Sequence, residues 1–359
     1  MTPHSMTTDE RWMARCLQLA RCGCCGAPPN PMVGAVIVYQ DRIIGEGYHV
    51  KCGEAHAEVN AFAAVTHPEW LKDSTLYVSL EPCSHFGRTP PCADLIVRKG
   101  VRRVVVGCID PYSEVSGRGV RLLRQAGIEV EVGVLEKECM ELNRKFIVSQ
   151  TQGRPFVTLK WAESADGFMA PEVLPSQNIF ISTPRTLMRA HRLRSEHQAV
   201  MIGRRTAQLD NPSLTVRRWS GPQPLRVVLD RDGVLSPSLR IFDGEAPTLV
   251  CGGRDNGVRR SQADCDYIGL DYTRPVLPQV LAELQRRRVQ SLLVEGGRQL
   301  LQSFIDAGLW DEAHVEIGNA RFGGGLPAPD INLPPVNEEI LWGHTVKHYR
   351  RTDGVQSGR

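Results

Sequence analysis

The chain has 359 residues, more than the roughly 100 to 200 of a typical domain, and 42% of them are hydrophobic, enough for two buried cores. The 43 basic and 40 acidic side chains leave a net charge of +3 and form no basic stripe, which argues against polyanion binding as the main function. The 11 cysteines, several of them adjacent, and the absence of an apolar segment in residues 1–11 predict a reducing, cytoplasmic location without a membrane anchor.

Short apolar runs alternate with helical stretches through the first half of the chain. The runs have strand length and lack strict polar alternation, which predicts a sheet covered on both faces. We expect strands at residues 33–39, 76–80, 103–109 and 128–134. We expect helices at residues 8–22, 56–66, 90–99, 117–126 and 136–150. This alternation is typical of an α/β sandwich.

One histidine, one glutamate and two cysteines occur in an order typical of a catalytic zinc site. Glu58 follows His56 by two residues, and Cys83 and Cys92 each follow a proline. Zinc takes imidazole and thiolate ligands in tetrahedral geometry, and three protein ligands leave one position open for water. Zinc would lower the pKa of that water from about 15.7 towards roughly 7, and a carboxylate could carry its proton to a departing amine. We therefore predict His56, Cys83 and Cys92 as zinc ligands and Glu58 as the catalytic residue.

The spacing of these residues also predicts where the site lies. Residues two apart in a helix interior point about 200° away from each other, so His56 and Glu58 can face one metal only at a helix end. The segments that begin at His56 and beside Cys92 both have the residues of a helix start. Two positive helix N-termini facing the metal would favour ionised thiols.

The segment between the two cysteines leads to a family resemblance. His-x-Glu followed by Pro-Cys-x-x-Cys is the signature of zinc-dependent nucleobase deaminases, but here eight residues separate Cys83 from Cys92. With this insert, the chain resembles the bifunctional deaminase and reductase family of riboflavin biosynthesis. The resemblance covers the first 150 residues through segments 30–34, 45–49, 56–61, 80–92, 110–111 and 117–119. It implies a cytidine-deaminase-like, three-layer α/β/α domain.

In that family, the insert and the asparagine of the Asn-Pro loop help to hold a phosphoribosylated diaminopyrimidinone. The resemblance therefore implies a substrate contact for Asn30. It implies the same for His49, His85 and Arg88, although these three could equally be solvated loop residues. A separate cluster of cysteines has no histidine at ligand spacing, so we expect reduced thiols and not a second metal at Cys22, Cys24 and Cys25.

The stretch 151–155 breaks the pattern and predicts a boundary between a domain of residues 1–150 and a domain of residues 151–359. A second α/β series follows it. We expect strands at residues 156–162, 199–203, 225–230, 248–251, 291–295 and 314–317. We expect helices near residues 183–195, 277–288 and 298–307. The polar tail beyond His348 is expected to be frayed.

Taken alone, few residues of the second half indicate a chemistry. Glu295 precedes a glycine pair that ends a predicted strand and opens a helix, where bare amides suit a phosphate, although such a pair is more often a tight turn. No G-x-G-x-x-G fingerprint occurs, so a Rossmann domain is not predicted. The arginines between residues 185 and 194 are typical of a solvated helix face.

The second half resembles the reductase of the same family in segments 160–162, 164–167, 192–194, 202–203, 206, 210–212, 214–217 and 295–297. The resemblance implies a dihydrofolate-reductase-like α/β domain that reduces the ribosyl group to ribityl with NADPH. It implies substrate contacts by Asn178, Arg194, Leu214, Arg217 and Glu295, and cofactor contacts by Phe180, Thr206, Asp210 and Gly297. Four residues depart from the usual pattern, namely Ala165, Asn178, Phe180 and Gln198. Since Phe180 keeps an aromatic wall and Asn178 a hydrogen-bonding group, we expect reductase activity to be retained.

These observations favour a two-step enzyme with Zn²⁺ and NADPH as cofactors. Its expected partner is a small phosphorylated pyrimidine, with no nucleic acid and no membrane, and the family implies a homo-oligomer. Three alternatives stay open: a nucleic-acid base deaminase with an appended targeting domain, a deaminase whose second domain has lost reductase activity, and a zinc-stabilised binding protein without turnover.

Overall fold

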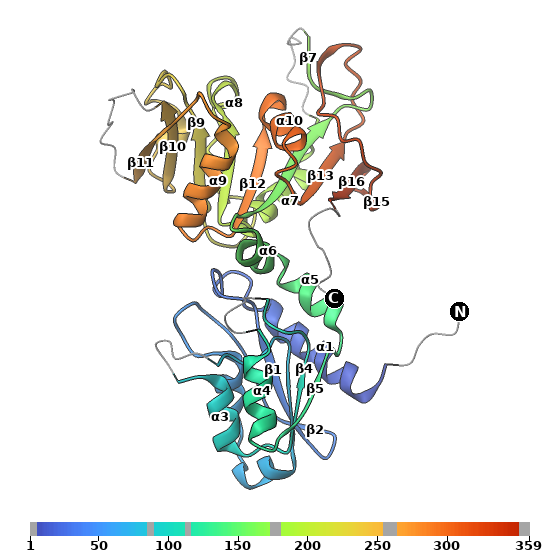
Figure 1. Ribbon diagram of the computed structural model, residues 1–359. Helices are drawn as coiled ribbons and strands as arrows, with labels where there is room; N and C mark the ends of the chain where they lie inside the picture. The colour runs from blue at the N-terminus through green and yellow to red at the C-terminus, as the bar shows by residue number, and fades with distance from the viewer. Residues whose placement is uncertain (1–5, 85–89, 112–115, 173–180, 254–263, 352–359) are drawn as a thin grey trace. The chain divides into compact units, whose positions relative to one another are not determined.

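The protein consists of two compact units, residues 1–153 and residues 154–359. The structure is a computed structural model that describes residues 6–84, 90–111, 116–172, 181–253 and 264–351. Each unit contains its own large sheet flanked by helices (Figure 1). The predicted alternation of strands and helices is therefore confirmed in both halves of the chain.

The N-terminal unit has a five-stranded sheet in the order β2-β1-β3-β4-β5. Strand β1 (Gly34–Tyr39) pairs antiparallel with β2 (Arg42–Tyr48) and with β3 (Thr75–Val78). Strands β3, β4 (Arg103–Val106) and β5 (Glu129–Val132) are parallel. The helices are α1 (Thr8–Arg21), α2 (Ala57–Ala63), the 3-10 helix η1 (Pro68–Asp73), α3 (Cys92–Lys99), α4 (Arg118–Gln125), α5 (Glu136–Leu142) and α6 (Arg144–Gln152).

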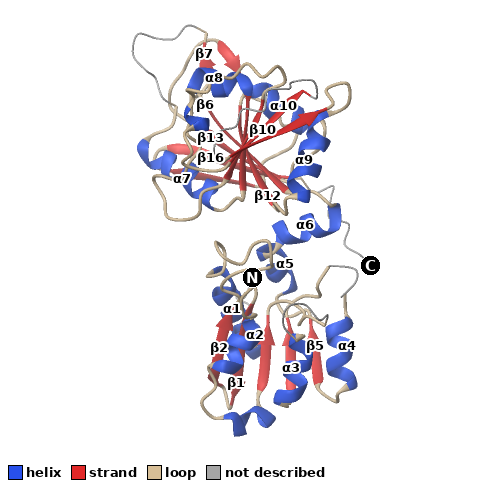
Figure 2. Ribbon diagram, turned by 90° about the vertical axis from the view of Figure 1, so that its left-hand side faces the viewer, coloured by secondary structure: helices blue, strands red, loops and turns tan. Residues whose placement is uncertain are grey.

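Successive strand residues of this sheet enter two separate apolar layers. Ala35 and Val104 pack with side chains of α2, α3 and α4 on one face. Their neighbours Val36 and Val105 pack with side chains of α1 and α5 on the other face. Because strand side chains alternate in direction, both faces are buried, and the unit has three layers, α/β/α (Figure 2).

Strand β2 is absent from the elements predicted from the sequence. It contains Gly45 and Gly47, and glycine weakens the signal of a strand. A Cβ atom at Gly45 would lie 2.4 Å from the carbonyl oxygen of Ala61, and a Cβ atom at Gly47 would lie 2.6 Å from the backbone nitrogen of Ala61. The two glycines therefore let α2 lie directly on the backbone of β2, which determines the position of the helix that begins after His56.

The single helix predicted over residues 136–150 is wrong, because the chain turns at Asn143 between α5 and α6. Asn143 has φ −101° and ψ 15°, outside the helical range. Its buried side chain accepts a hydrogen bond from the Met32 N–H (2.8 Å) and donates one to the Met32 carbonyl (2.9 Å). These bonds join positions 111 residues apart, so local sequence could not reveal the break.

The C-terminal unit has a nine-stranded sheet in the order β11-β10-β9-β8-β12-β6-β13-β16-β15. Neighbouring strands from β11 to β13 are parallel, and β16 is antiparallel to both β13 and β15. The strands are β6 (Phe156–Glu163), β8 (Ala199–Gly203), β9 (Leu225–Leu229), β10 (Thr248–Gly253), β11 (Cys265–Leu270), β12 (Ser291–Gly296), β13 (Glu312–Ile317), β15 (Asn337–Leu341) and β16 (His344–Arg350). A separate pair is formed by β7 (Phe168–Pro171) and β14 (Gly325–Pro327).

The predicted fraying beyond His348 is wrong for residues 349 and 350. Strand β16 continues to Arg350, which pairs with Glu312 of β13. Helices α7 (Pro184–Ser195) and α8 (Arg204–Asp210) contribute Leu193 and Ala207 to one apolar face of the sheet. Helices α9 (Val276–Arg286) and α10 (Arg298–Asp306) cover the other face. A short 3-10 helix, η2, spans Arg240–Phe242.

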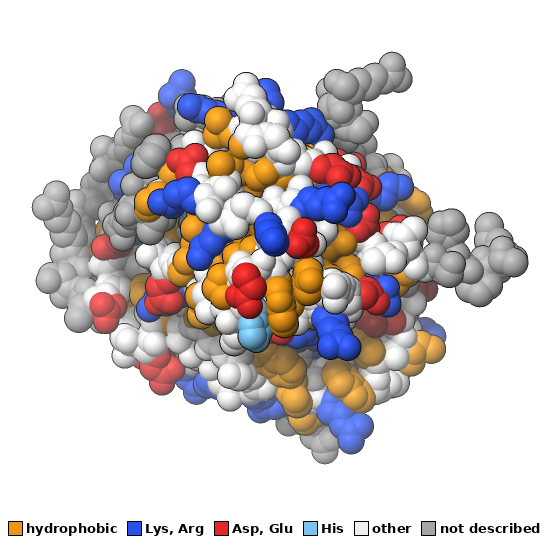
Figure 3. All heavy atoms as spheres, turned by 90° about the horizontal axis from the view of Figure 1, so that it is seen from below, with side chains coloured by type: hydrophobic (Ala, Val, Ile, Leu, Met, Phe, Trp, Pro, Cys, Tyr) orange, Lys and Arg blue, Asp and Glu red, His pale blue; other side chains and the backbone are white. Residues whose placement is uncertain are grey.

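Figure 3 shows one face of the molecule. On the face seen in Figure 3, basic and acidic side chains are interspersed and neither forms a continuous field. Within the described ranges, every helix is too short or too polar to span a lipid bilayer.

Arg226 on β9 is a fully buried cation in the C-terminal unit. Its guanidinium donates to Asp243 Oδ1 (2.8 Å), to Thr248 Oγ1 (3.0 Å) and to the carbonyl oxygens of residues 213, 240 and 246. The side chain thus satisfies acceptors from several loops at once, and a buried acceptor without a partner is costly.

Replacing this arginine should destabilise the unit. We expect Arg226→Met to lower the free energy of unfolding by about 3 kcal/mol, because it leaves Asp243 and several carbonyls without their donor. Denaturant unfolding combined with hydrogen exchange of β9 and β10 would measure the loss. Arg286→Met is the control, because the Arg286 side chain is 69% exposed, and it should change the free energy of unfolding by less than about 0.5 kcal/mol. Equal effects of the two substitutions would contradict this role.

Candidate functional site

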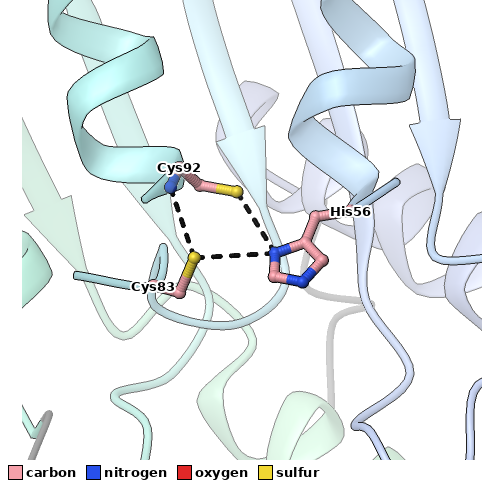
Figure 4. Close-up of side chains that lie close together, drawn as sticks. All are labelled: His56, Cys83 and Cys92. Carbon is pink, nitrogen blue, oxygen red and sulfur yellow. Dashed lines mark hydrogen bonds between the residues drawn. The ribbon is translucent and has the colours of Figure 1, made fainter. Parts of the chain in front are cut away.

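The three predicted zinc ligands meet in the N-terminal unit, where two helices begin. His56 is the N-cap of α2, and Cys92 is the first residue of α3. Cys83 lies in the loop after β3, where its sulfur accepts a hydrogen bond from the Cys92 N–H at 3.2 Å. His56 Nδ1 lies 3.5 Å from Cys83 Sγ and 3.3 Å from Cys92 Sγ (Figure 4).

The donor atoms have the spacing that zinc requires. A tetrahedral ion with a Zn–N distance of about 2.0 to 2.1 Å and a Zn–S distance of about 2.3 Å separates nitrogen from sulfur by about 3.6 Å. The two observed N–S distances are close to this value, and all three donors lie within 4.8 Å of one another. One imidazole and two thiols are also ligands that zinc prefers. The residues therefore fit the ion.

The same triad is the one group of histidine, cysteine and acidic donors that lies close enough to share an ion among the residues for which positions are given. Three protein ligands leave one tetrahedral position for solvent or substrate, which distinguishes a catalytic from a structural zinc site. Hydrogen bonding with Cys92 lowers the pKa of the Cys83 thiol against the effect of burial, so the site favours a thiolate.

Glu58 lies in the first turn of α2 and is 3% exposed. Burial, and then the negative charge at Cys83, raise the pKa of its carboxyl group to about 6. His56 is the N-cap and Glu58 is the second residue of α2. Both therefore lie at the N-terminal end of the helix, as the two-residue spacing predicts. A carboxyl group with such a pKa can both accept and return a proton near neutral pH.

Asn30 and His49 form a hydrogen-bonded pair beside the ligands. His49 Nδ1 lies 3.0 Å from the Ala55 carbonyl, so this nitrogen carries the proton, and Nε2 accepts from Asn30 Nδ2 at 3.1 Å. The amide oxygen of Asn30 makes none of these bonds. The His49 ring also meets the His56 ring edge to face, with centroids 5.4 Å apart.

These side chains line one pocket with a volume of about 280 Å³. The predicted residues Asn30, His49, His56, Glu58 and Cys83 all contribute to it. Leu80, Glu81, Asp110 and the α6 side chains Phe146 and Gln150 complete much of the remaining wall. The structure thus brings five of the predicted deaminase residues into one cavity, and the sixth described one, Cys92, lies beside His56 and Cys83.

Glu81 was not among the predicted site residues, although it stands two positions before Cys83. Its carboxylate accepts four backbone N–H bonds, from residues 110, 117, 119 and 120, at 2.8 to 3.2 Å. Two of these donors belong to the first turn of α4, whose amides lack partners within the helix. Glu81 therefore joins the ligand loop to the segment that carries Asp110.

In the C-terminal unit, Arg194 on α7 and Glu295 on β12 form a two-point ion pair. Both N–O distances are 2.6 Å, and the two side chains are 12% and 11% exposed. Burial disfavours the charged carboxylate, but the charge of Arg194 outweighs it and lowers the pKa of Glu295. Both residues are expected substrate contacts, and the structure places them together.

Thr215 connects the two expected arginines. Its carbonyl accepts from Arg194 Nη1 (3.2 Å), and its hydroxyl accepts from Arg217 Nη1 (2.8 Å). The Arg217 N–H donates to His191 Nδ1 at 3.1 Å. Burial, and then the charges of Arg194 and Arg217, lower the pKa of His191 to about 4, so its ring is neutral at pH 7. Leu214, also an expected contact, is buried next to Thr215.

The expected cofactor residues lie on α8 and at the start of α10. Gly297 is the N-cap of α10, and a Cβ atom there would lie 2.9 Å from Thr206 Oγ1 on α8. Only glycine, which has no side chain, fits this turn without a close contact to Thr206. Among the described residues, no side chain caps the first backbone N–H groups of α10, and such groups can bind a cofactor phosphate. Asp210 lies at the end of α8, where burial raises its pKa.

Four expected site residues, His85, Arg88, Asn178 and Phe180, lie outside the described residues. The residues that sequence reasoning missed in the two sites are Glu81, Asp110, Phe146, Gln150, His191 and Thr215. Asp110 and Thr215 lie within segments that carry the family resemblance. Phe146 and Gln150 have only a helical i, i+4 spacing, which buried helix faces share.

Both units of the chain match families of known proteins. Residues 6–108 match the family model of the cytidine and deoxycytidylate deaminase zinc-binding region, and residues 155–337 match the RibD C-terminal domain. The riboflavin biosynthesis protein RibD of Aquifex aeolicus (strain VF5) is 40% identical over 334 residues, which cover 92% of this chain and 93% of that protein. The RibD protein of Escherichia coli (strain K12) is 36% identical over 330 residues, which cover 88% of this chain and 89% of that protein.

Solved structures give the same result. The chain is similar to the crystal structure of a diaminohydroxyphosphoribosylaminopyrimidine deaminase/5-amino-6-(5-phosphoribosylamino)uracil reductase from Thermotoga maritima. The TM-score is 0.86 at 37% identity, covering 96% of this chain and 98% of that chain. RibD from Acinetobacter baumannii gives a TM-score of 0.84 at 33% identity, covering 95% and 98%.

The ligand set can be tested by metal content. We expect Cys83→Ser and His56→Ala each to weaken zinc affinity by more than about 100-fold, because even partners outside the ligand set typically contribute 10- to 100-fold. Elemental analysis after dialysis against a metal buffer would measure this. Cys52→Ser, at an exposed cysteine, is the control and should keep full zinc. Full occupancy in both ligand variants would show that the assignment is wrong.

Proposed function

The chain belongs to the RibD family of riboflavin biosynthesis proteins, and from this premise we propose which residues perform its two reactions. It is a bifunctional enzyme, a zinc-dependent deaminase and an NADPH-dependent reductase, with a cytidine-deaminase-like and a dihydrofolate-reductase-like half. We assign deamination to a domain of residues 1–150 and reduction to a domain of residues 151–359.

The proposed substrate of the first half is a phosphoribosylated diaminopyrimidinone. The observation that carries this proposal is the buried carboxyl group of Glu58, which lines the same pocket as the zinc ligands His56 and Cys83. When bound, the zinc ion supplies Lewis-acid polarisation and makes water more acidic. Asn30, held by His49, presents its amide oxygen as an acceptor for an amino group of the ring.

Glu58 is the proton carrier of the proposed deamination. Its carboxylate accepts a proton from the attacking water while the water oxygen bonds to the ring carbon that bears the amine. Glu58 passes this proton to the ring nitrogen, then takes the remaining proton of the new hydroxyl group and delivers it to the amine. The hydroxyl oxygen becomes the carbonyl oxygen of the product as the carbon–nitrogen bond breaks and ammonia leaves. The pKa of about 6 lets Glu58 act in both directions.

The proposed role of the second half is reduction of the ribosyl group of the deaminated product. NADPH supplies the hydride, so the protein needs to align the sugar with the nicotinamide and exclude water. Arg217 is exposed and directs its guanidinium donors beside Thr215, which suits the substrate phosphate. The ion pair with Glu295 orients Arg194 at the same site. Thr206, Asp210 and Gly297 would lie along the cofactor.

The alternatives to this function differ in measurable ways. A polynucleotide deaminase would need a basic surface, whereas charges of both signs are interspersed on the face in Figure 3. A deaminase with an inactive second domain would release ammonia but leave the NADPH absorbance unchanged. Incubation with the phosphoribosylated diaminopyrimidinone, first without and then with NADPH, separates the two activities. We propose in addition that the enzyme forms a homo-oligomer and acts on this small molecule without nucleic acid.

Glu58→Gln tests the proton carrier. We expect ammonia release to fall roughly 10²- to 10⁴-fold, because glutamine has similar size but cannot transfer the proton. Zinc content should stay at the parental level, and the NADPH-dependent step, assayed with deaminated substrate, serves as the internal control. Deamination at the parental rate would remove Glu58 from this role.

Two adjacent arginines offer a matched test of the reductase site. We expect Arg217→Ala to raise the KM for the phosphorylated substrate roughly 10- to 100-fold, because a charge-assisted bond contributes about 1.5 to 3 kcal/mol. The affinity for NADPH should not change. Arg218→Ala removes a neighbouring exposed arginine and should change KM less than about twofold. The same loss in both variants would contradict a specific phosphate contact.

A further inference from the structure

We propose that Phe146 and Gln150 on α6 form the part of the deaminase pocket that recognises the sugar of the substrate's ribosylamino arm. This inference deepens the proposed deaminase function and rests on it. Neither residue belongs to a segment that carries the family resemblance, yet both line the pocket that contains Glu58 and Cys83. They would determine specificity without taking part in the chemical step.

Asn143 attaches this helix to the substrate loop. Its two hydrogen bonds to Met32 imitate a backbone pair, and its side chain is 2% exposed. Met32 stands two residues after Asn30 in the Asn-Pro loop. The attachment comes just before the first residue of α6, so it fixes the start of the helix against the loop that carries Asn30. Because α6 is attached to the loop that carries Asn30, its side chains in the pocket have a fixed position relative to that residue.

A series of contacts leads from the zinc ligands outward to α6. The His56 ring packs edge to face on His49, and His49 accepts from Asn30. Two residues further along the chain, Met32 binds Asn143. The reacting carbon must lie at the beginning of this series, beside His56 and Glu58. Helix α6 is attached at the other end of this series, so we assign its side chains to the part of the substrate that is remote from the departing amine.

The two side chains suit a sugar by their chemistry. Phe146 and Gln150 are four residues apart and therefore share one face of α6. Within the described residues, no hydrogen bond occupies the Gln150 amide, which offers both a donor and an acceptor. Sugar hydroxyls also donate and accept, whereas a phosphate dianion is usually bound by arginine or lysine. Phe146 provides an apolar surface for the sugar carbons or the ring face.

The test compares KM and kcat of deamination for Gln150→Ala in the full chain. We expect KM for the phosphoribosylated substrate to rise roughly 3- to 10-fold, the range for loss of a neutral hydrogen bond, with kcat within about twofold of the parent. Phe146→Leu should also raise KM and not kcat, and it keeps enough apolar volume for the helix to pack. Thr151→Ala, an exposed position of α6, is the matched control and should change neither constant.

A sugar-free diaminopyrimidinone with a plain amine in place of the ribosylamino arm is the second probe, used as a competitive inhibitor. Its inhibition constant should differ by less than about twofold between Gln150→Ala and the parent. An equal loss for both compounds would assign Gln150 to the ring and overturn the proposal. A lower kcat with unchanged KM, or no change at all, would also overturn it. Absence of ammonia release by the parent enzyme would instead refute the proposed deaminase function.

Discussion

The deaminase half depends on one constraint: two helices must begin at the same place, with their first residues close enough to share an ion. His56 Nδ1 and Cys92 Sγ, at the starts of the two helices, are 3.3 Å apart, and Cys83 Sγ from the loop after β3 lies 3.5 Å from the same nitrogen. Gly45 and Gly47 allow α2 to lie on the backbone of β2, and Glu81 attaches the loop of Cys83 to the start of α4. Small deviations in either attachment would separate the donors by more than zinc tolerates.

The reductase half is organised by a different interaction, the buried ion pair between Arg194 and Glu295. Charges removed from water must be paired, and here each partner makes two short bonds with the other. The pair keeps Arg194 in place beside Thr215 and Arg217. Burial, and then the charges of the two arginines, lower the pKa of His191 and keep its ring neutral. One half therefore holds a cation with thiols and an imidazole, while the other is suited to anions.

The comparison of predicted and observed elements shows where sequence patterns are sufficient. Most helices and parallel strands occur close to the predicted positions, because their apolar runs are long and buried on both faces. Strand β2 was missed because its glycines serve helix packing. Helix α8 and strands β7, β11, β14, β15 and β16 were missed because their sequences contain no long apolar run. The division of residues 136–152 into α5 and α6 depends on Asn143 and Met32, which are distant in sequence. Pocket residues on α6 were missed for the same reason.

The sequence by itself determined the chemistry of the metal site and the family of the protein, because those depend on residue types at short, ordered spacings. His56, Glu58, Cys83 and Cys92 could be identified from their order alone, and the helix-end geometry followed from the helical period. Only the tertiary structure decided which other side chains share the pocket with them. Glu81 gains its four amide donors, and Phe146 and Gln150 reach the pocket, through contacts between segments far apart in the chain, and no local pattern encodes such contacts.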